Sequence, residues 1–157
     1  PALVERAGNG QDGQGSITAF YTVLTEGDDQ QDPIADAARG ILDGHFVLTR
    51  DLAESGHYPA IDIGQSISRV MPTIVSKEHM NAQMLLKRMF NKVNQNRELI
   101  TVGAYTEGAD LELDHALKAY GALEALLQQP QDEKSSFSDG LAKIKLMLPK
   151  LFNGVSK

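Results

Sequence analysis

The chain has 157 residues, a formal net charge of −6 and no cysteine. A chain of this length buries a serviceable core and makes one domain, or at most two small ones. The acidic balance argues against a nucleic-acid-binding surface, which needs a basic stripe. The absence of cysteine excludes disulfides and thiolate metal sites. No run of about 18 apolar residues is present, so we expect no transmembrane helix and a cytoplasmic protein.

The first 24 residues predict the tail of a helix, a polar loop and a strand. Residues Pro1–Ala7 look like the end of a helix that starts upstream. Because the sequence begins at Pro1, without Met or a leader, we expect it to be a piece of a longer protein. The glycine-rich run Gly8–Gly15 has no Lys of the kind that a phosphate-binding loop needs, which favours a surface connection. Ser16–Leu24 is a continuous β-branched and aromatic run, typical of a strand covered on both faces in a parallel sheet.

The stretch from residue 32 to residue 69 predicts a helix, a strand and a brief helix, followed by a turn-rich run. Asp32 suits the N-cap, Pro33 the first helical position and Gly44 the residue just past the helix end. An apolar strand is expected at His45–Leu48. Together with the strand at Ser16–Leu24, it predicts a right-handed βαβ unit in a mostly parallel sheet. Ligands of such sheets bind at the carboxyl ends of the strands.

The turn-rich run presents two candidate site residues, Tyr58 and Arg69. The arginine either pairs with a nearby carboxylate such as Asp62 or Asp51, or offers its fork of donors to a phosphate. The tyrosine, in Gly-His-Tyr-Pro, is by default a partly buried packing residue. Spacing alone leaves both alternatives open.

Other charged and titratable residues give weaker signals. The acidic run Glu26–Asp32 is either a solvated loop or a contact surface for a basic partner. The histidines lack the spacing of metal ligands, so we expect no metal site; they are His45, His57, His79 and His115.

From about Ser76 the pattern becomes helical. Apolar residues recur at helical spacing in three segments. The segments end near Asn96, cover Asp110–Gln128 and begin near Phe137, where Ser136 and Asp139 have capping-box spacing. A shorter helix is expected at residues 97–102. We therefore expect an antiparallel helical bundle packed on the end of an α/β half-domain.

Three phrases identify a family by resemblance. They are Asp-Pro-Ile-Ala-Asp-Ala-Ala-Arg-Gly-Ile-Leu-Asp-Gly-His from residue 32, Gly-His-Tyr-Pro-Ala-Ile-Asp-Ile from residue 56, and Ser-Ile-Ser-Arg-Val from residue 66. They closely resemble the flagellum-specific protein-export ATPases, a branch of the rotary ATPase superfamily that includes the F- and V-type subunits. The virulence type III secretion ATPases are the neighbouring branch and the alternative.

The resemblance implies a fold and a division of the chain. Residues 1–75 would be the C-terminal portion of a RecA-like P-loop ATPase domain with a parallel sheet, and residues 76–157 the C-terminal helical domain. The parent protein would be a homo-hexamer that binds ATP with Mg²⁺ at subunit interfaces. The family's phosphate-binding loop, catalytic Glu and Mg²⁺-side Asp have no counterpart among the 157 residues. We therefore expect this chain alone to be inactive.

The resemblance also assigns residue roles. Arg69 would be the arginine finger that reaches the nucleotide of a neighbouring subunit, and Tyr58 would stack on the adenine of its own subunit's nucleotide. The acidic residues Glu26, Asp28, Asp29 and Asp32 would form a partner loop facing the central stalk.

The partners implied for the parent are the flagellar stalk protein, a regulatory peripheral-stalk protein, the export gate and chaperone–cargo complexes. The parent would work in the cytoplasm, at the cytoplasmic face of the inner membrane, coupling ATP hydrolysis to type III export of flagellar proteins. A third alternative is a non-catalytic docking module for export chaperones or the stalk.

Overall fold

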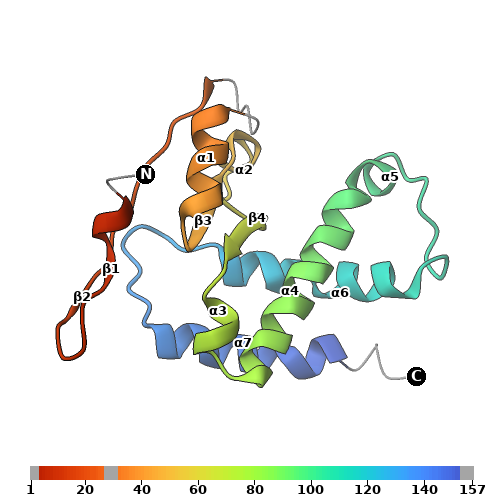
Figure 1. Cartoon of the computed structure of the whole chain (residues 1–157). Helices are drawn as coiled ribbons and strands as arrows, with labels where there is room; N and C mark the ends of the chain where they lie inside the picture. The colour runs from red at the N-terminus through yellow and green to blue at the C-terminus, as the bar shows by residue number, and fades with distance from the viewer. Residues whose placement is uncertain (1–3, 27–31, 153–157) are drawn as a thin grey trace.

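The computed structural model describes residues 4–26 and 32–152, with side chains up to residue 147. The N-terminal part contains four short strands and several short helices. Its elements are η1 (Val4–Arg6), β1 (Gly8–Asn9), β2 (Ser16–Ile17), α1 (Pro33–Ile41), β3 (Gly44–Leu48), α2 (Arg50–Glu54), β4 (Ile61–Ser68) and α3 (Met71–Ile74). The rest is helical, with α4 (Lys77–Gln95), α5 (Arg97–Thr101), α6 (Leu111–Leu127) and α7 (Phe137–Phe152). Figure 1 shows these two parts side by side.

The strands of the described residues pair as two antiparallel hairpins, β1 with β2 and β3 with β4. The predicted parallel βαβ pairing is therefore wrong for this part of the chain. Of the strand expected at Ser16–Leu24, only Ser16–Ile17 is a strand, paired with Gly8–Asn9 of the loop. Residues 18–24 are not in a strand, because a strand depends on ladder pairing with a neighbouring strand and not on propensity alone.

Helix α1 begins as predicted but ends differently. The Asp32 carboxylate accepts hydrogen bonds from the backbone N–H groups of Ile34 and Ala35, each at 2.9 Å. Leu42 caps the C-terminus in an extended conformation, so Gly44 is not the helix-ending glycine that was expected. It begins β3 instead, where a Cβ atom would lie 2.5 Å from the carbonyl oxygen of Ile67 on β4.

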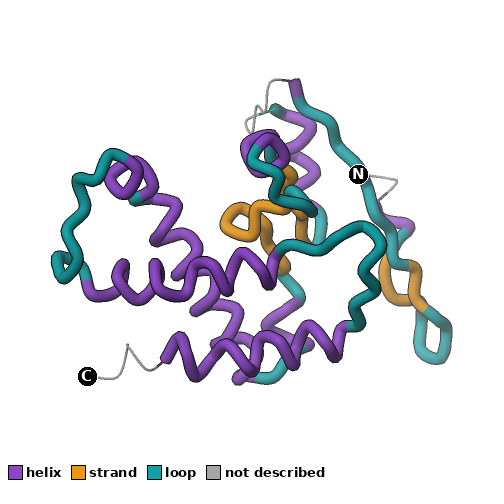
Figure 2. Tube along the Cα trace, turned by 180° about the vertical axis from the view of Figure 1, so that it is seen from behind, coloured by secondary structure: helices purple, strands orange, loops and turns teal. Residues whose placement is uncertain are grey.

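The helical part confirms the expected segments. Asn96 ends α4, Asp110 caps α6 through the N–H of Leu113, and the short helix α5 lies between α4 and α6. Ser136 and Asp139 form the predicted capping box before α7, each accepting from the other's backbone N–H. In Figures 1 and 2, α6 and α7 run in opposite directions and α4 crosses them.

The core of the described residues lies almost entirely in the helical part. Its buried cluster joins α4 and α6 and consists of Leu86, Met89, Val93, Leu113, Ala116 and Leu123. The Phe90 and Tyr120 rings stack beside it, with centroids 6.1 Å apart. Among the described residues before α4, only His57 is buried.

The α/β part exposes large apolar side chains. Phe20 is 85 % and Leu24 89 % exposed in the segment after β2, and Phe46 is 72 % and Leu48 68 % exposed on one face of β3. Because alternate residues of a strand point to the same face, Phe46 and Leu48 form one apolar surface. Monomeric proteins rarely expose contiguous apolar surface of this kind, so this face has the character of an interface.

Candidate functional site

Tyr58 lies in the turn between α2 and β4, where it is 55 % exposed. Its backbone is fixed on the helical side, because the Gln129 N–H donates to its carbonyl oxygen at 2.9 Å. The Tyr58–Pro59 peptide bond is cis. Figure 2 shows the loop after α6 passing beside the β3–β4 hairpin, which brings Gln129 to this turn. The ring is therefore offered to solvent on an anchored backbone, not buried as a packing residue.

Arg69 follows β4 directly and is exposed. Its N–H donates to the carbonyl of Asp43 at 2.8 Å. The guanidinium donates to two carbonyl oxygens at the end of α1, those of Arg39 at 2.8 Å and Gly40 at 3.4 Å. A helix C-terminus carries partial negative charge and attracts such a cation.

The carboxylate partners considered for Arg69 are not its partners. Within the described residues Arg69 makes no ion pair with Asp62, Asp51 or any other acid. Asp62 instead accepts from the N–H groups of Gly64 at 2.7 Å and Gln65 at 3.1 Å, holding the irregular turn of β4. The positive charge of Arg69 thus has no neutralising carboxylate in this part of the chain.

The two candidate residues lie at opposite ends of the β3–β4 hairpin. The register pairs Gly44 with Ser68 and Leu48 with Ile61. The four residue steps of β3 between these pairs span about 13 Å. Tyr58 precedes one end and Arg69 follows the other, so the structure does not bring them to one ligand. One hairpin can present them to two different ligands.

The predicted partner loop is described only at its edges. Glu26 is exposed. Asp32 caps α1, so one of its carboxylate oxygens is already engaged. Asp28 and Asp29 lie outside the described residues.

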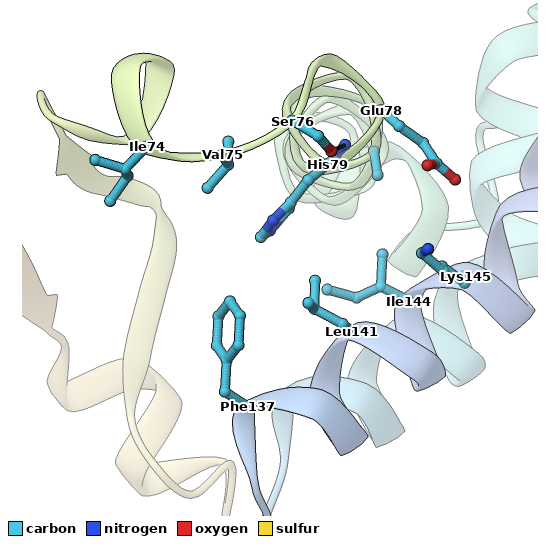
Figure 3. Close-up of a pocket in the computed structure, with 10 residues that line it drawn as sticks. Ile74, Val75, Ser76, Glu78, His79, Phe137, Leu141, Ile144 and Lys145 are labelled. Atoms are coloured by element: carbon cyan, nitrogen blue, oxygen red, sulfur yellow. Dashed lines mark hydrogen bonds between the residues drawn. The ribbon is translucent and has the colours of Figure 1, made fainter.

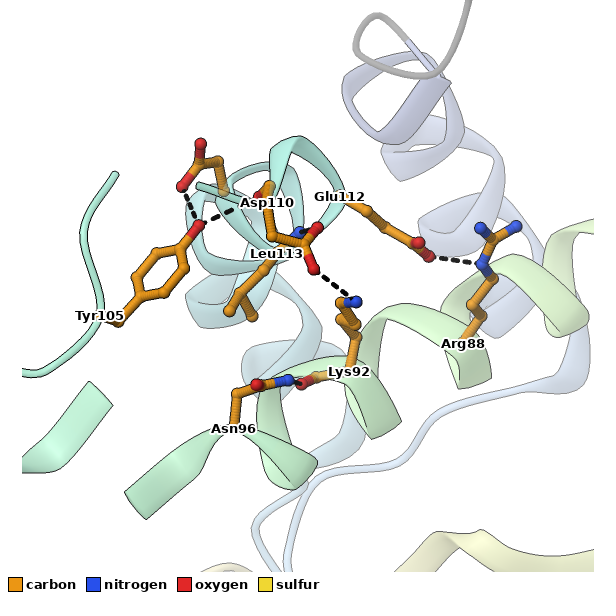
Figure 4. Close-up of polar contacts among 8 residues, drawn as sticks. Arg88, Lys92, Asn96, Tyr105, Asp110, Glu112 and Leu113 are labelled. Atoms are coloured by element: carbon orange, nitrogen blue, oxygen red, sulfur yellow. Dashed lines mark hydrogen bonds and ion pairs between the residues drawn. The ribbon is translucent and has the colours of Figure 1, made fainter. Parts of the chain in front are cut away.

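Sequence reasoning missed a polar network around the loop between α5 and α6 (Figure 4). The Asp114 carboxylate, only 7 % exposed, accepts from the Tyr105 hydroxyl at 2.5 Å and the Gly108 N–H at 2.8 Å. Asp110 pairs with Lys92 at 2.6 Å. The network fastens the loop to α4 and α6. The one sequence signal was Asp114, a turn after the cap Asp110.

The same contacts shift three acid–base groups. The Tyr105 hydrogen bond holds the pKa of Asp114 below its usual value. Desolvation, with Asp114 close by, raises the pKa of Tyr105 to about 12. The ammonium group of Lys92 lowers the pKa of Asp110.

An apolar cavity of about 260 Å³ lies between the α3–α4 junction and α7 (Figure 3). The rings of His79 and Phe137 both line it and point toward each other, with centroids 6.2 Å apart. None of the predicted site residues lines it. The described residues contain no group of three or more His, Cys, Asp or Glu side chains placed to hold a metal ion. None of the described helices is long and apolar enough to cross a membrane.

Two family models divide the chain. Residues 1–68 match the ATP synthase alpha/beta family, nucleotide-binding domain. Residues 75–145 match the T3SS EscN ATPase C-terminal domain. The first part of the chain is thus similar to the nucleotide-binding domain of the ATP synthase α/β family, and the helical part is similar to a type III secretion ATPase domain. The flagellar and type III secretion ATPases of the rotary ATPase superfamily are relatives of this chain.

Two curated relatives represent the two branches. A flagellum-specific ATP synthase of Pseudomonas aeruginosa is 57 % identical over 94 % of this chain and 33 % of its own length. A type 3 secretion system ATPase of Sinorhizobium fredii is 49 % identical over 88 % of this chain and 30 % of its own length. The chain therefore spans about a third of the length of the curated relatives it matches.

A solved structure confirms the fold class, an α/β portion of a nucleotide-binding domain followed by an all-α domain. It is the assembled ATPase EscN in complex with its central stalk EscO, from enteropathogenic E. coli. The TM-score is 0.79 at 43 % identity, over 99 % of this chain and 35 % of that chain.

Proposed function

We propose that this chain is the C-terminal portion of a flagellar protein-export ATPase, which couples ATP hydrolysis to type III export of flagellar proteins. The observation that carries the proposal is the β3–β4 hairpin. It presents an exposed aromatic ring at one end and an arginine without a carboxylate partner at the other. The 57 % identity to the flagellar relative, against 49 % to the secretion ATPase, favours the flagellar branch.

Arg69 has the chemistry of an arginine finger. Its guanidinium is held only by the carbonyls of Arg39 and Gly40, and a carbonyl is a weaker acceptor than a phosphate, which forms charge-assisted bonds with arginine. A γ-phosphate presented by a neighbouring subunit therefore competes well for the donors. The distance of Arg69 from Tyr58 along the hairpin fits a role at a neighbour's nucleotide.

Tyr58 has the chemistry of an adenine contact. An aromatic ring that is 55 % exposed provides a stacking face, and its anchored backbone limits the entropy lost when a base binds. Stacking of this kind needs no charge on the ring. We assign the base of the subunit's own nucleotide to this position.

The phosphate side of the site lies outside these residues. The 157 residues contain no Gly-x-x-x-x-Gly-Lys-Ser/Thr sequence. Phosphoryl transfer depends on that loop, on Mg²⁺ and on an oriented water. The chain contributes the finger and the base contact, and by itself it does not hydrolyse ATP.

The assembly and partners are part of the proposal. We divide the chain into an ATPase-domain portion, residues 1–75, and a helical domain, residues 76–157. The parent is a homo-hexamer at the cytoplasmic face of the inner membrane. Its acidic loop at Glu26, Asp28, Asp29 and Asp32 faces the stalk. The helical domain meets the regulatory peripheral-stalk protein, the export gate and chaperone–cargo complexes.

Two alternatives differ in partner or in chemistry. A virulence secretion ATPase has the same residue roles and different export substrates. A docking module for export chaperones or the stalk has no nucleotide role, and it predicts that changes at Tyr58 and Arg69 leave nucleotide turnover unchanged.

The experiment is Arg69→Ala in the full-length ATPase, with ATP turnover and ATP affinity measured separately. An arginine finger contributes roughly 10³–10⁵ to the rate, or about 4–7 kcal/mol of barrier. We expect turnover to fall by that order while ATP affinity stays within a few-fold. Arg69→Lys, which keeps the charge and loses the fork of donors, should also be strongly impaired.

Arg50→Ala is the matched control, because Arg50 is an exposed arginine at the start of α2. It should turn over ATP at the parent rate. Unchanged turnover in Arg69→Ala would remove the role given to Arg69. Measurable hydrolysis by the 157-residue chain alone would overturn the division of labour between this chain and the phosphate-binding loop.

A further inference from the structure

His57 is unusual in the α/β part, because it is only 4 % exposed while its neighbours Gly56 and Tyr58 face solvent. Burying an imidazole is costly unless its ring nitrogens have hydrogen-bond partners. The Nδ1 atom lies 3.3 Å from the Nε2 atom of Gln128, which follows α6. An amide nitrogen can only donate, so Nδ1 is the acceptor in this contact.

The backbone of the turn beside this contact is held by the segment after α6 and by α2. The Gln129 N–H donates to the Tyr58 carbonyl at 2.9 Å, and the His57 N–H donates to the Leu52 carbonyl at 2.9 Å. Two consecutive residues of the turn, 57 and 58, are thus bound by two consecutive residues after α6, 128 and 129. One hydrogen bond leaves the turn free to rotate about it. Two adjacent bonds fix its orientation.

We propose that His57 and Gln128 are positioning residues for Tyr58, setting the orientation of its ring for the nucleotide base. This inference rests on the base contact assigned to Tyr58 under the proposed function. His57 does not touch the nucleotide. It acts by holding the turn against the end of α6, so that the Tyr58 ring is already in place when the base arrives. A ring that must first be ordered binds more weakly, because the ordering cost reduces the affinity.

A purely structural role for His57 makes a different prediction. A histidine that only fills a buried space affects the stability of the chain and leaves base affinity unchanged once the protein is folded. Gln128 separates the two roles. Gln128 is exposed, so truncating its side chain should affect the stability of the fold little. The truncation does remove the hydrogen-bond donor to Nδ1 of His57.

The test uses the full-length ATPase and titration calorimetry with two probes, Mg²⁺–ATP and Mg²⁺–tripolyphosphate. Only ATP carries a base. We expect Gln128→Ala and His57→Leu each to weaken ATP binding by about 2- to 10-fold, the range of one modest hydrogen bond. Tripolyphosphate affinity should not change. The double variant should bind ATP no more weakly than the worse single variant, because the two residues share one contact.

Rescue and control variants complete the design. His57→Asn puts an amide oxygen near the place of Nδ1 and should restore ATP affinity to within about twofold, whereas His57→Leu does not. His115→Ala removes a half-buried histidine near the start of α6 and should leave both affinities unchanged. If His57→Leu fails to fold, Gln128→Ala and His57→Asn carry the test.

Tyr58→Ala separates the base contact of Tyr58 from the positioning role of His57 and Gln128. Loss of ATP affinity in Tyr58→Ala, with parental affinity in Gln128→Ala and His57→Leu, overturns the positioning inference and leaves the base contact standing. Unchanged ATP affinity in Tyr58→Ala overturns the base contact and the inference with it. Equal losses for ATP and tripolyphosphate in Gln128→Ala would also overturn the inference, because a disturbed fold, not the base, would then be responsible.

Discussion

Leu123→Ala should weaken the helical core from which the turn at Tyr58 is held. Leu123 is 1 % exposed and belongs to the cluster that joins α4 and α6. It lies one turn before Leu127, where α6 ends. Losing three buried carbons costs about 2.4 kcal/mol at about 0.8 kcal/mol each. The residual cavity raises the total to about 3–5 kcal/mol.

This loss is large against a typical stability of about 5–15 kcal/mol. The measurement is urea unfolding of the 157-residue chain, followed by circular dichroism at a helix-sensitive wavelength. With an m-value of about 2 kcal/mol/M, the midpoint should fall by about 1.5–2.5 M. Helix propensity does not confuse the result, because alanine is at least as good a helix former as leucine.

Leu146→Ala is the matched control, the same substitution at a position of α7 that is 75 % exposed. Its effect should stay within about 0.5 kcal/mol. Equal midpoints for the two variants would show that Leu123 is not in a packed core. A loss under about 1 kcal/mol for Leu123→Ala would refute the packing described for α6.

Three further predictions concern polar contacts. The hydrogen bond from Tyr105 lowers the pKa of Asp114, so the ionised Asp114 carboxylate stabilises the fold above its unfolded-state pKa, and this stabilisation is lost as the pH falls below about 4. Urea unfolding of Asp114→Asn should therefore show a smaller loss of stability in acid than urea unfolding of the parent chain. Burial and Asp114 raise the pKa of Tyr105 to about 12, so its stabilising effect should persist to about pH 10 and disappear as the pH rises through 12. The ultraviolet phenolate signal that Tyr105→Phe removes should titrate near that value, and a midpoint near 10 would contradict the contact. Asp32→Ala removes the N-cap of α1 and should cost about 1 kcal/mol of stability. The loss should appear as faster backbone hydrogen exchange in α1, whereas Asp36→Ala, at a position that is not the N-cap, should leave this exchange nearly unchanged.

The helical part could be predicted from the sequence because its information is local. The apolar stripes of α4 and α6 and the Ser136–Asp139 capping box are all set by residues three or four positions apart. The structure confirms each of them. The motif around Tyr58 and Arg69 likewise identified the family from a contiguous run of residues, without any tertiary information.

The strands could not be predicted in the same way, because a strand depends on its neighbour. The apolar run Ser16–Leu24 has strand propensity along its whole length, yet only its first two residues find a partner among the described residues. The β3–β4 hairpin is antiparallel because the turn at residues 49–60 brings the two strands back side by side. Neither propensity nor periodicity contains the identity of a partner strand.

The sequence by itself determined the family, the helices and the two residues of interest, since each is written in a short contiguous pattern. The tertiary structure decided what those residues touch. It placed the Arg69 guanidinium on the carbonyls that end α1, and not on an aspartate. It brought Gln128 to His57 across 71 positions of sequence and so anchored the turn that presents Tyr58. Contacts between residues that far apart depend on how α6 packs against α4, which no local pattern specifies.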